Sequence, residues 1–326
     1  MHTLRLFGLD ASRDFASGIA EYLDVELSRH VERWFPDREP YIRSEVNVRN
    51  CDVYVVQSLY TDDQESVADK LLKLLIFVGS LKHASARRVT VVAPYLCFAR
   101  QDRKTESRAP ITSKYLCRWI RSSGAGRLLS IDPHNLSAFQ NGLDIPSDFL
   151  EARPLFIEYV AKELEESGLK NLVILSPDKS IERALKLRDS LEKRLKMNIG
   201  SAYLDKRRVG ENGEKVDGNV MVGDCDLEGK TAIVVDDIIS TGGSIKRCTE
   251  VAGNAGCELW GVCATHGVFV GNYAQNLKAV PRVIITDTVL KGTPIPNLKV
   301  LSTARLCGKA IRRIHNHGGS ISDLLK

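Results

Sequence analysis

Two adjacent carboxylates stand directly before a loop that has the composition of a phosphate-binding turn. In AIVVDDIISTGGSI, residues 232–245, a strand-like run leads to Asp236 and Asp237, and then to Ser240, Thr241, Gly242, Gly243 and Ser244. Glycines let backbone N–H groups converge on an anion, and the start of a helix adds partial positive charge. The hydroxyls of Thr241 and Ser244 add further donors.

The carboxylates would repel a phosphate, so they must bind another part of the same ligand. Neighbouring sugar hydroxyls suit them, because a carboxylate accepts two hydrogen bonds from a diol, and a metal ion bound to the ligand would also fit. The pattern therefore predicts a phosphorylated sugar. The structural alternative is an acidic strand end followed by an ordinary helix cap.

A second glycine segment, GDCDLEGKT at residues 223–231, nearly matches the ATP-binding P-loop. It has five residues between the glycines instead of four, and three of the five are acidic. It also precedes its strand, so we interpret it as a surface turn.

Composition narrows the class of protein. The chain has 326 residues, which suggests two domains, and its net charge of +5 does not by itself indicate a nucleic-acid partner. The eight cysteines form no C-x-x-C pair, which favours reduced, buried thiols in a cytoplasmic protein over zinc or disulfides. We see no signal peptide, and no apolar run approaches the roughly 20 residues of a membrane span.

Short apolar strands alternate with helical patterns along the chain. We expect strands at 52–58, 88–96, 127–132, 171–176, 231–235, 259–266 and 282–287, and helices at 67–78, 110–121, 154–167, 180–195 and 244–255. The alternation predicts an α/β protein with two doubly wound parallel-sheet domains, residues 1–150 and 151–303, and a C-terminal helix over about 304–326 that packs on the first domain. Ligands of such sheets bind at the carboxyl ends of strands, here the turns at 94–108, 132–135, 176–181 and 236–244.

These motifs together resemble one family. The Asp-Asp pair with its loop is similar to the phosphoribosyl diphosphate motif of type I phosphoribosyltransferases. Collinear with it, PYLCFARQDRK (94–104), SRAPIT (107–112), IDPHN (131–135), IPSDFLEARPLF (145–156), DKRR (205–208) and ATHGVFVGNYAQNL (264–277) resemble segments of ribose-phosphate diphosphokinase, also called phosphoribosyl pyrophosphate synthetase. The resemblance covers nearly the whole chain and implies the type I phosphoribosyltransferase architecture.

The resemblance implies transfer of the diphosphoryl group of ATP to the 1-hydroxyl of ribose 5-phosphate, which yields 5-phosphoribosyl 1-diphosphate and AMP. It assigns Lys206 and Arg208, in a mobile loop over 205–219, to catalysis, and Arg208 with Asp236, Asp237 and residues 240–244 to ribose 5-phosphate. It assigns Arg100, Gln101 and Asp102 to ATP, together with Phe35, Asp37 and Glu39 from a neighbouring subunit of a homo-oligomer. It assigns His134 and Asp178 to Mg²⁺.

The match departs from the family in places. A glycine pair usually follows Ser-Pro-Asp, whereas this chain has Lys179, then Ser180 and Ile181; Ile181 restricts the backbone, and the charge of Lys179 could compensate. Ser240 stands where many members have aspartate, and Arg38 where glycine is usual. The alternatives are therefore a non-catalytic regulatory homologue, a phosphoribosyltransferase and, more distantly, a nucleic-acid binder.

Overall fold

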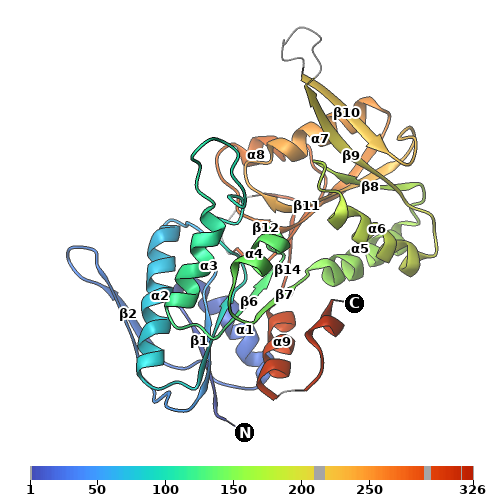
Figure 1. Cartoon of the computed structure of the whole chain (residues 1–326). Helices are drawn as coiled ribbons and strands as arrows, with labels where there is room; N and C mark the ends of the chain where they lie inside the picture. Colours follow the sequence, from blue (N-terminus) through green and yellow to red (C-terminus); the bar gives the residue numbers. More distant parts are fainter. Residues whose placement is uncertain (1, 209–216, 290–294, 317, 326) are drawn as a thin grey trace. The chain divides into compact units, whose positions relative to one another are not determined.

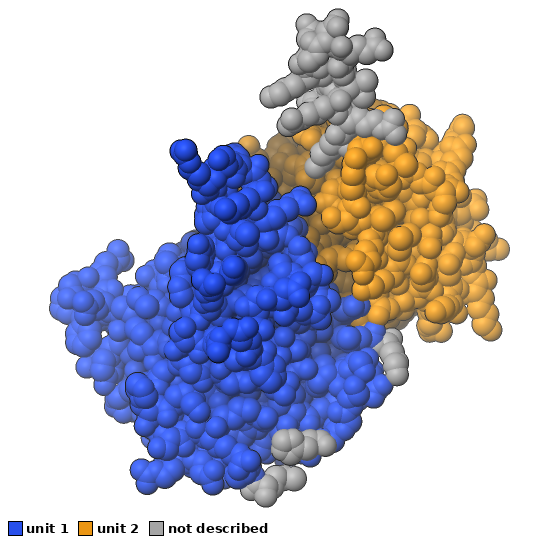
Figure 2. All heavy atoms as spheres, viewed as in Figure 1, with its two compact units in different colours: residues 1–151, 287–291, 302–326 blue, residues 152–286, 292–301 orange. Residues whose placement is uncertain are grey.

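The computed structural model describes residues 2–208, 217–289, 295–316 and 318–325 (Figure 1). These residues form two compact units, which Figure 2 distinguishes by colour. Unit 1 comprises Met1–Glu151, Asp287–Lys291 and Ser302–Lys326, and unit 2 comprises Ala152–Thr286 and Gly292–Leu301. Among the described helices, none has the length and hydropathy that a membrane span requires.

Unit 1 is built on a parallel sheet whose strand order follows the chain. The strands, in spatial order, are β1 (Leu4–Gly8), β4 (Asp52–Val56), β5 (Arg88–Ala93), β6 (Arg127–Ile131) and β7 (Ser147–Leu150). Every residue of β4 is buried. A continuous run of apolar residues is typical of a parallel strand that is covered on both faces.

Helices cover both faces of this sheet. Alternate strand residues point to opposite faces, and Val53 and Val55 of β4 pack with Leu74 and Phe77 of α2. The helices of this layer are α2 (Val67–His83), α3 (Thr112–Ser122) and α4 (Leu136–Gly142). On the other face, α1 (Arg13–Leu23) packs on β1 and on α9 (Ala304–Asn316), so the end of the chain completes the core of unit 1.

Two glycines allow α1 and α9 to approach closely. A Cβ atom on Gly18 would lie 2.9 Å from Cβ of Ala304, and one on Gly308 would lie 2.5 Å from Cδ1 of Tyr22. The helix α9 ends at Asn316, and a short helix, η2 (Ile321–Leu324), follows. The C-terminal helix is therefore shorter than the expected 304–326.

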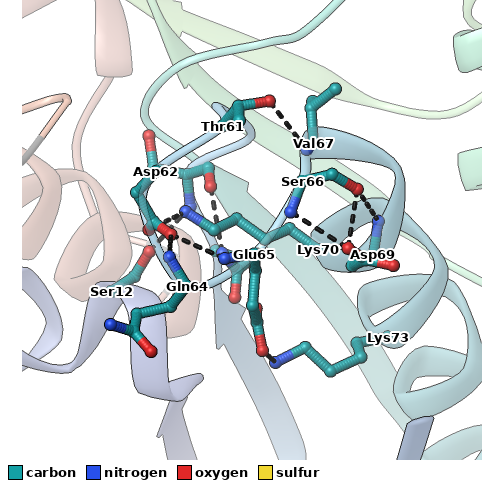
Figure 3. Close-up of polar contacts among 12 residues, drawn as sticks. Ser12, Thr61, Asp62, Gln64, Glu65, Ser66, Val67, Asp69, Lys70 and Lys73 are labelled. Carbon is teal, nitrogen blue, oxygen red and sulfur yellow. Dashed lines mark hydrogen bonds and ion pairs between the residues drawn. The ribbon is translucent and has the colours of Figure 1, made fainter. Parts of the chain in front are cut away.

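A hairpin outside the main sheet is fixed to α2 by buried charges. It consists of β2 (His30–Trp34) and β3 (Pro40–Ser44), which pair antiparallel. Lys73 of α2 lies 2.5 Å from Glu32 of β2. Lys73 also lies 2.5 Å from Glu65, and Lys70, one turn earlier, pairs with Asp62 (Figure 3). Both lysines are fully buried, so these ion pairs satisfy charges that would otherwise be costly inside the protein.

Unit 2 contains the larger sheet, in which the strand order reverses. Its spatial order is β10 (Asp217–Gly223), β9 (Gly200–Arg208), β8 (Leu172–Ser176), β11 (Thr231–Ile239), β12 (Glu258–Gly267), β13 (Val283–Thr286) and β14 (Leu298–Leu301). Of the described strand pairs in this sheet, only β9–β10 is antiparallel. Its helices are α5 (Arg153–Ser167), α6 (Glu182–Leu195), α7 (Gly243–Asn254) and α8 (Tyr273–Asn276).

The reversal identifies where a ligand should bind. The chain passes from β8 to β9 on one side and then returns to place β11 on the other side of β8. Crevices at the carboxyl ends of strands form at such reversals. The end of β8 leads to Asp178, and the end of β11 carries Asp236 and Asp237.

The prediction of parallel α/β sheets is confirmed, and two of the segments expected to carry site residues differ in detail. β11 continues to Ile239, so Asp236 and Asp237 lie inside the strand and do not follow it. The stretch at 205–219 is not a loop throughout, because 200–208 and 217–223 form the paired arms of a hairpin. The part of that loop at 209–216 lies outside the described residues.

Candidate active site

The acidic pair near the end of β11, Asp236 and Asp237, lies close to another carboxylate, Asp178. Asp236 pairs in register with Ala264 of β12, and its Oδ1 accepts a hydrogen bond of 2.8 Å from the N–H of Asp237. Burial raises the pKa of the Asp236 carboxyl well above its usual range, and the neighbouring carboxylates of Asp237 and Asp178 raise it further. A ligand that supplies hydroxyl donors or a cation would therefore be favoured here.

The loop after β11 has the backbone conformation that an anion site needs. Gly242 adopts φ of 74° at the N-cap of α7, and a Cβ atom there would lie 3.2 Å from Cγ of Leu277. Both the positive φ and the limited space favour glycine. The helix begins at Gly243, one residue before the expected start, so its first N–H groups lie beside Thr241 and Ser244.

The loop is supported from behind by the segment that follows β12. Asn276 Nδ2 donates to the carbonyl oxygen of Thr241 at 2.9 Å, and the N–H of Val270 donates to the carbonyl oxygen of Ser240 at 3.1 Å. With these carbonyl groups engaged, the loop is held in shape before any ligand arrives. Asn276 was not identified from the sequence, although it lies in the ATHGVFVGNYAQNL motif.

The turn after β8 lies next to this loop. β8 and β11 pair in parallel, with Leu175 opposite Val234, so their carboxyl ends meet at one edge of the sheet. In the turn, Asp178 Oδ1 accepts a hydrogen bond of 2.7 Å from the N–H of Ser180. The charge of Asp178 contributes to the raised pKa of Asp236, so the structure places these two predicted residues near one another.

Lys206 and Arg208 lie on the β9 arm of the hairpin. In register with β10, Lys206 is opposite Asn219 and Arg208 is opposite Asp217. The residue before them, Asp205, is buried and forms an ion pair of 2.9 Å with Lys179 of the turn after β8. The backbone thus places both predicted catalytic residues on a strand that neighbours β8.

In unit 1, the predicted ATP-side residues lie after β5 and the predicted metal ligand His134 lies after β6. The two turns are joined by a hydrogen bond of 2.5 Å from Asn135 Nδ2 to Asp102 Oδ2. Asn135 also caps α4 by accepting a bond of 3.1 Å from the N–H of Ala138. Arg100 and Gln101 are exposed, and Gln101 accepts a hydrogen bond from Thr112.

The residues predicted to contact adenine lie at the tip of the β2–β3 hairpin. Phe35 is 42% exposed, and its ring packs edge-on against Tyr41 with 5.8 Å between centroids. The N–H of Phe35 donates to the carbonyl oxygen of Glu39 at 2.9 Å, and the N–H of Glu39 donates to Asp37 Oδ1 at 3.2 Å. The tight turn displays an aromatic ring and two carboxylates on the surface.

A different set of side chains has metal-ligand spacing. Among the described residues, Asp10, His30 and Glu32 of unit 1 place potential ligand atoms within 4.8 Å of one another. Glu32 already pairs with Lys73 at 2.5 Å and lies 2.9 Å from His30 Nε2. The lysine supplies the positive charge that a metal would supply, so this group is explained as an ion-pair network. The predicted ligands His134 and Asp178 belong to different units.

Comparisons with known proteins cover the whole chain. Residues 4–124 match the N-terminal domain of ribose phosphate pyrophosphokinase, and residues 201–326 match the phosphoribosyl synthetase-associated domain. The ribose-phosphate pyrophosphokinase of Rhodopirellula baltica is 37% identical over 100% of this chain and 99% of its own length. That of Nostoc is 36% identical over 100% of this chain and 94% of its own length.

A solved structure agrees with these sequence comparisons. The crystal structure of phosphoribosylpyrophosphate synthetase from Mycobacterium smegmatis matches with a TM-score of 0.85 and 31% sequence identity, over 97% of this chain and 100% of that one. Identity at this level over full length, together with the same arrangement of both units' elements, leaves one assignment. The chain belongs to the ribose-phosphate pyrophosphokinase family.

Proposed function

We infer that this protein transfers the diphosphoryl group of ATP to the 1-hydroxyl of ribose 5-phosphate. The 1-oxygen of the sugar forms a bond to the β-phosphorus, the bond from that phosphorus to the α,β-bridging oxygen breaks, and AMP leaves with the bridging oxygen. The hydroxyl proton is lost in the same reaction. The main support for this function is the 37% identity to a ribose-phosphate pyrophosphokinase over 100% of this chain. The chain also contains the Asp236–Ser244 site.

For ribose 5-phosphate, we propose that Asp236 and Asp237 accept hydrogen bonds from the sugar hydroxyls. The loop at 240–244 would hold the 5-phosphate through the first N–H groups of α7 and the hydroxyls of Ser240, Thr241 and Ser244. The support is the left-handed Gly242 and the bonds that fix the loop from behind. A sugar held at both ends has its 1-hydroxyl in a defined position, which is the main requirement of a transfer reaction.

For ATP, we propose contacts from Arg100, Gln101 and Asp102, and adenine contacts from Phe35, Asp37 and Glu39 of a neighbouring subunit. The guanidinium of Arg100 is exposed and suits phosphate oxygens because it is a fixed fork of donors. The exposed ring of Phe35 at a hairpin tip supports its use between subunits. The protein would then act as a homo-oligomer with a shared ATP site.

Lys206 and Arg208 are proposed to stabilise the negative charge that develops on the transferring phosphoryl group and on the bridging oxygen, and Arg208 also to contact ribose 5-phosphate. Loss of one such donor typically costs about 3–4 kcal/mol of activation free energy. Their position beside Asp205 on β9, the neighbour of β8, supports a role at this edge of the sheet.

A divalent cation fits the donor set of unit 2. The carboxylates of Asp178, Asp236 and Asp237 repel one another, and a cation would relieve that repulsion. We propose that Asp178 and His134 hold Mg²⁺, which would neutralise the phosphate oxygens of ATP when bound. The free cysteines of the described residues support a cytoplasmic location.

The test is formation of AMP from ATP, Mg²⁺ and ribose 5-phosphate by the purified protein. We expect AMP that depends on the sugar, a product with a diphosphate on carbon 1 by ³¹P NMR, and loss of at least about 100-fold in turnover in Lys206→Ala. Lys162→Ala, an exposed lysine of α5, is the control. Sugar binding without AMP would contradict the proposal, as would consumption of phosphoribosyl diphosphate only when a base is added.

A further inference from the structure

The β2–β3 hairpin has one face that is anchored to unit 1 and one face that is exposed. On the anchored face, Glu32 pairs with the buried Lys73 at 2.5 Å, and Ile42, directly opposite Glu32 in register, belongs to the hydrophobic core. Lys73 Nζ also lies 5.7 Å from the centre of the Trp34 ring, so β2 is held as far as the residue before Phe35. The hairpin is therefore held against α2, and its tip projects from the body of unit 1 (Figure 1).

The exposed face carries an arginine beside two aromatic rings. Arg33 and Tyr41 are directly opposite each other in register, and Phe35 lies two residues further along the chain. The guanidinium carbon of Arg33 lies 4.3 Å from the ring centre of Tyr41 and 5.5 Å from that of Phe35. The two ring centres are 5.8 Å apart, with 81° between the ring planes. These distances are those of cation–π and edge-to-face contacts, so the three side chains form one cluster.

The two rings are the only contacts that hold the guanidinium of Arg33 in the described part of the chain. Arg33 is exposed, and its side chain makes neither a hydrogen bond nor an ion pair with any described residue. A guanidinium stacks on aromatic rings because it is planar and weakly hydrated. An isolated exposed phenyl ring would change rotamer freely, whereas Phe35 is restricted by Arg33 and by Tyr41. Phe35 nevertheless stays 42% exposed, which leaves ring surface on which a planar base can stack.

We propose that Arg33 is a positioning residue for the base of ATP: together with Tyr41 it holds the Phe35 ring in the orientation in which adenine stacks on it. This inference rests on the proposed function and adds a residue to it. Stacking on a ring that is already held in place costs less side-chain entropy than stacking on a ring that must first be ordered. Arg33 acts through Phe35 and takes no part in the bonds that form and break.

The test compares Arg33→Ala, Tyr41→Leu and Tyr41→Phe with wild type. Arg43→Ala is the matched control, because Arg43 is an exposed arginine of the same hairpin that pairs with Glu45. Calorimetry with ATP and Mg²⁺ measures affinity without turnover, and the AMP assay gives kcat and both KM values. In Arg33→Ala and Tyr41→Leu we expect affinity for ATP to fall about fivefold, with kcat and KM for ribose 5-phosphate within about twofold of wild type. Tyr41→Phe keeps the ring and should match wild type.

A Phe35→Ala background shows whether Arg33 acts through the ring. If it does, adding Arg33→Ala to Phe35→Ala changes the affinity for ATP by less than about twofold. A second loss of about fivefold in that background would mean that Arg33 contacts the nucleotide itself, and the proposal would be wrong. Inorganic triphosphate has no base, so its affinity should be the same in wild type and in Arg33→Ala. A loss of triphosphate affinity would assign Arg33 to the phosphates and would also overturn the proposal.

The failure of this inference can be distinguished from the failure of the proposed function. If wild type forms no AMP, the proposed function is wrong. If Phe35→Ala binds ATP as wild type does, the proposed adenine contact is wrong, and this inference with it. If Phe35→Ala loses affinity for ATP but Arg33→Ala does not, this inference alone is wrong. Light scattering measures the assembly of each variant, and smaller oligomers in Arg33→Ala would attribute the lost affinity to disassembly and contradict a positioning role.

Discussion

Lys73 is a buried cation of α2 that contacts two carboxylates, and its replacement by methionine should destabilise unit 1 strongly. Its Nζ lies 2.5 Å from Glu65 (Figure 3) and 2.5 Å from Glu32. The side chains of Glu32 and Glu65 are only 5% and 13% exposed. Methionine fills similar space but carries no charge. Removing one partner of a buried ion pair leaves an uncompensated charge and typically costs about 3–5 kcal/mol.

The pKa of Glu32 gives an independent estimate of this magnitude. Burial would raise the pKa, but hydrogen bonds from His30 and Lys73 outweigh it and lower the pKa from 4.5 to about 2. A difference of that size corresponds to roughly 3 kcal/mol in favour of the charged form in the folded protein. Because the folded pKa is depressed, this stabilisation is present above pH 4.5 and is lost as the pH falls toward 2.

In Lys73→Met we expect the pKa of Glu32 to shift in the opposite direction. Burial without the cation should raise the pKa of Glu32 above its ordinary value. As the pH falls, Glu32 is then protonated, and the variant no longer holds an unpaired buried charge. The difference in free energy of unfolding between wild type and variant should therefore be about 3–5 kcal/mol at pH 7 and should shrink as the pH falls below about 5.

Chemical denaturation followed by tryptophan fluorescence measures this difference for unit 1. The chain has three tryptophans, and in a Trp260→Phe background the remaining two, Trp34 and Trp119, both lie in unit 1. The exposed Lys162→Met is the matched control and should change the free energy of unfolding by less than about 0.5 kcal/mol. A loss below about 1 kcal/mol in Lys73→Met, or a loss that does not vary between pH 7 and pH 4, would refute the reasoning.

Three further changes test the candidate site. Gly242→Ala should weaken ribose 5-phosphate binding and cost about 1–2 kcal/mol of stability, because alanine is strained at φ of 74° and lies against Leu277; calorimetry and denaturation measure the two effects. Asn135→Ala removes a helix cap and the bond to Asp102, so stability should fall by about 1 kcal/mol and KM for ATP should rise. An unchanged KM for ATP would show that this turn does not contribute to ATP binding. Asp236→Asn in metal-free buffer should raise the free energy of unfolding at pH 7 while abolishing sugar binding. Because the pKa of Asp236 is raised in the folded protein, its charged form destabilises the folded state at any pH above the ordinary pKa of an aspartate. Equal stability of variant and wild type would contradict this.

Much of the fold could be predicted because buried parallel strands are continuous apolar runs. The strands at 172–176 and 231–235 are of this kind, and both lie in the centre of the sheet of unit 2. Aspartate is disfavoured in strands, which is why the prediction ended β11 at Val235. The strand continues because β12 supplies backbone partners as far as Gly267, opposite Ile239.

Other structural features could not be predicted, because the sequence holds no pattern that indicates them. The hairpin arms at 205–208 and 217–219 are polar on both sides, and strand prediction depends on one face being apolar. The buried lysines of α2 look like surface residues in sequence, because their partners are spread from Glu32 to Glu65 and only the fold brings them together. Likewise, the link from Asn135 to Asp102 depends on β5 and β6 being neighbours in the sheet.

The electrostatics of the edge formed by β8, β9 and β11 argue that this edge is organised for substrate and not for stability. A fold selected only for stability would not place Asp236 where Asp237 and Asp178 repel it, since the raised pKa of Asp236 means free energy lost from the folded state at neutral pH. The ion pair between Lys179 and Asp205 offsets little of that loss, because Lys179 is largely exposed. Hydroxyl donors or a cation would each relieve the repulsion, so binding of the sugar or of a cation at this edge should restore part of the lost stability.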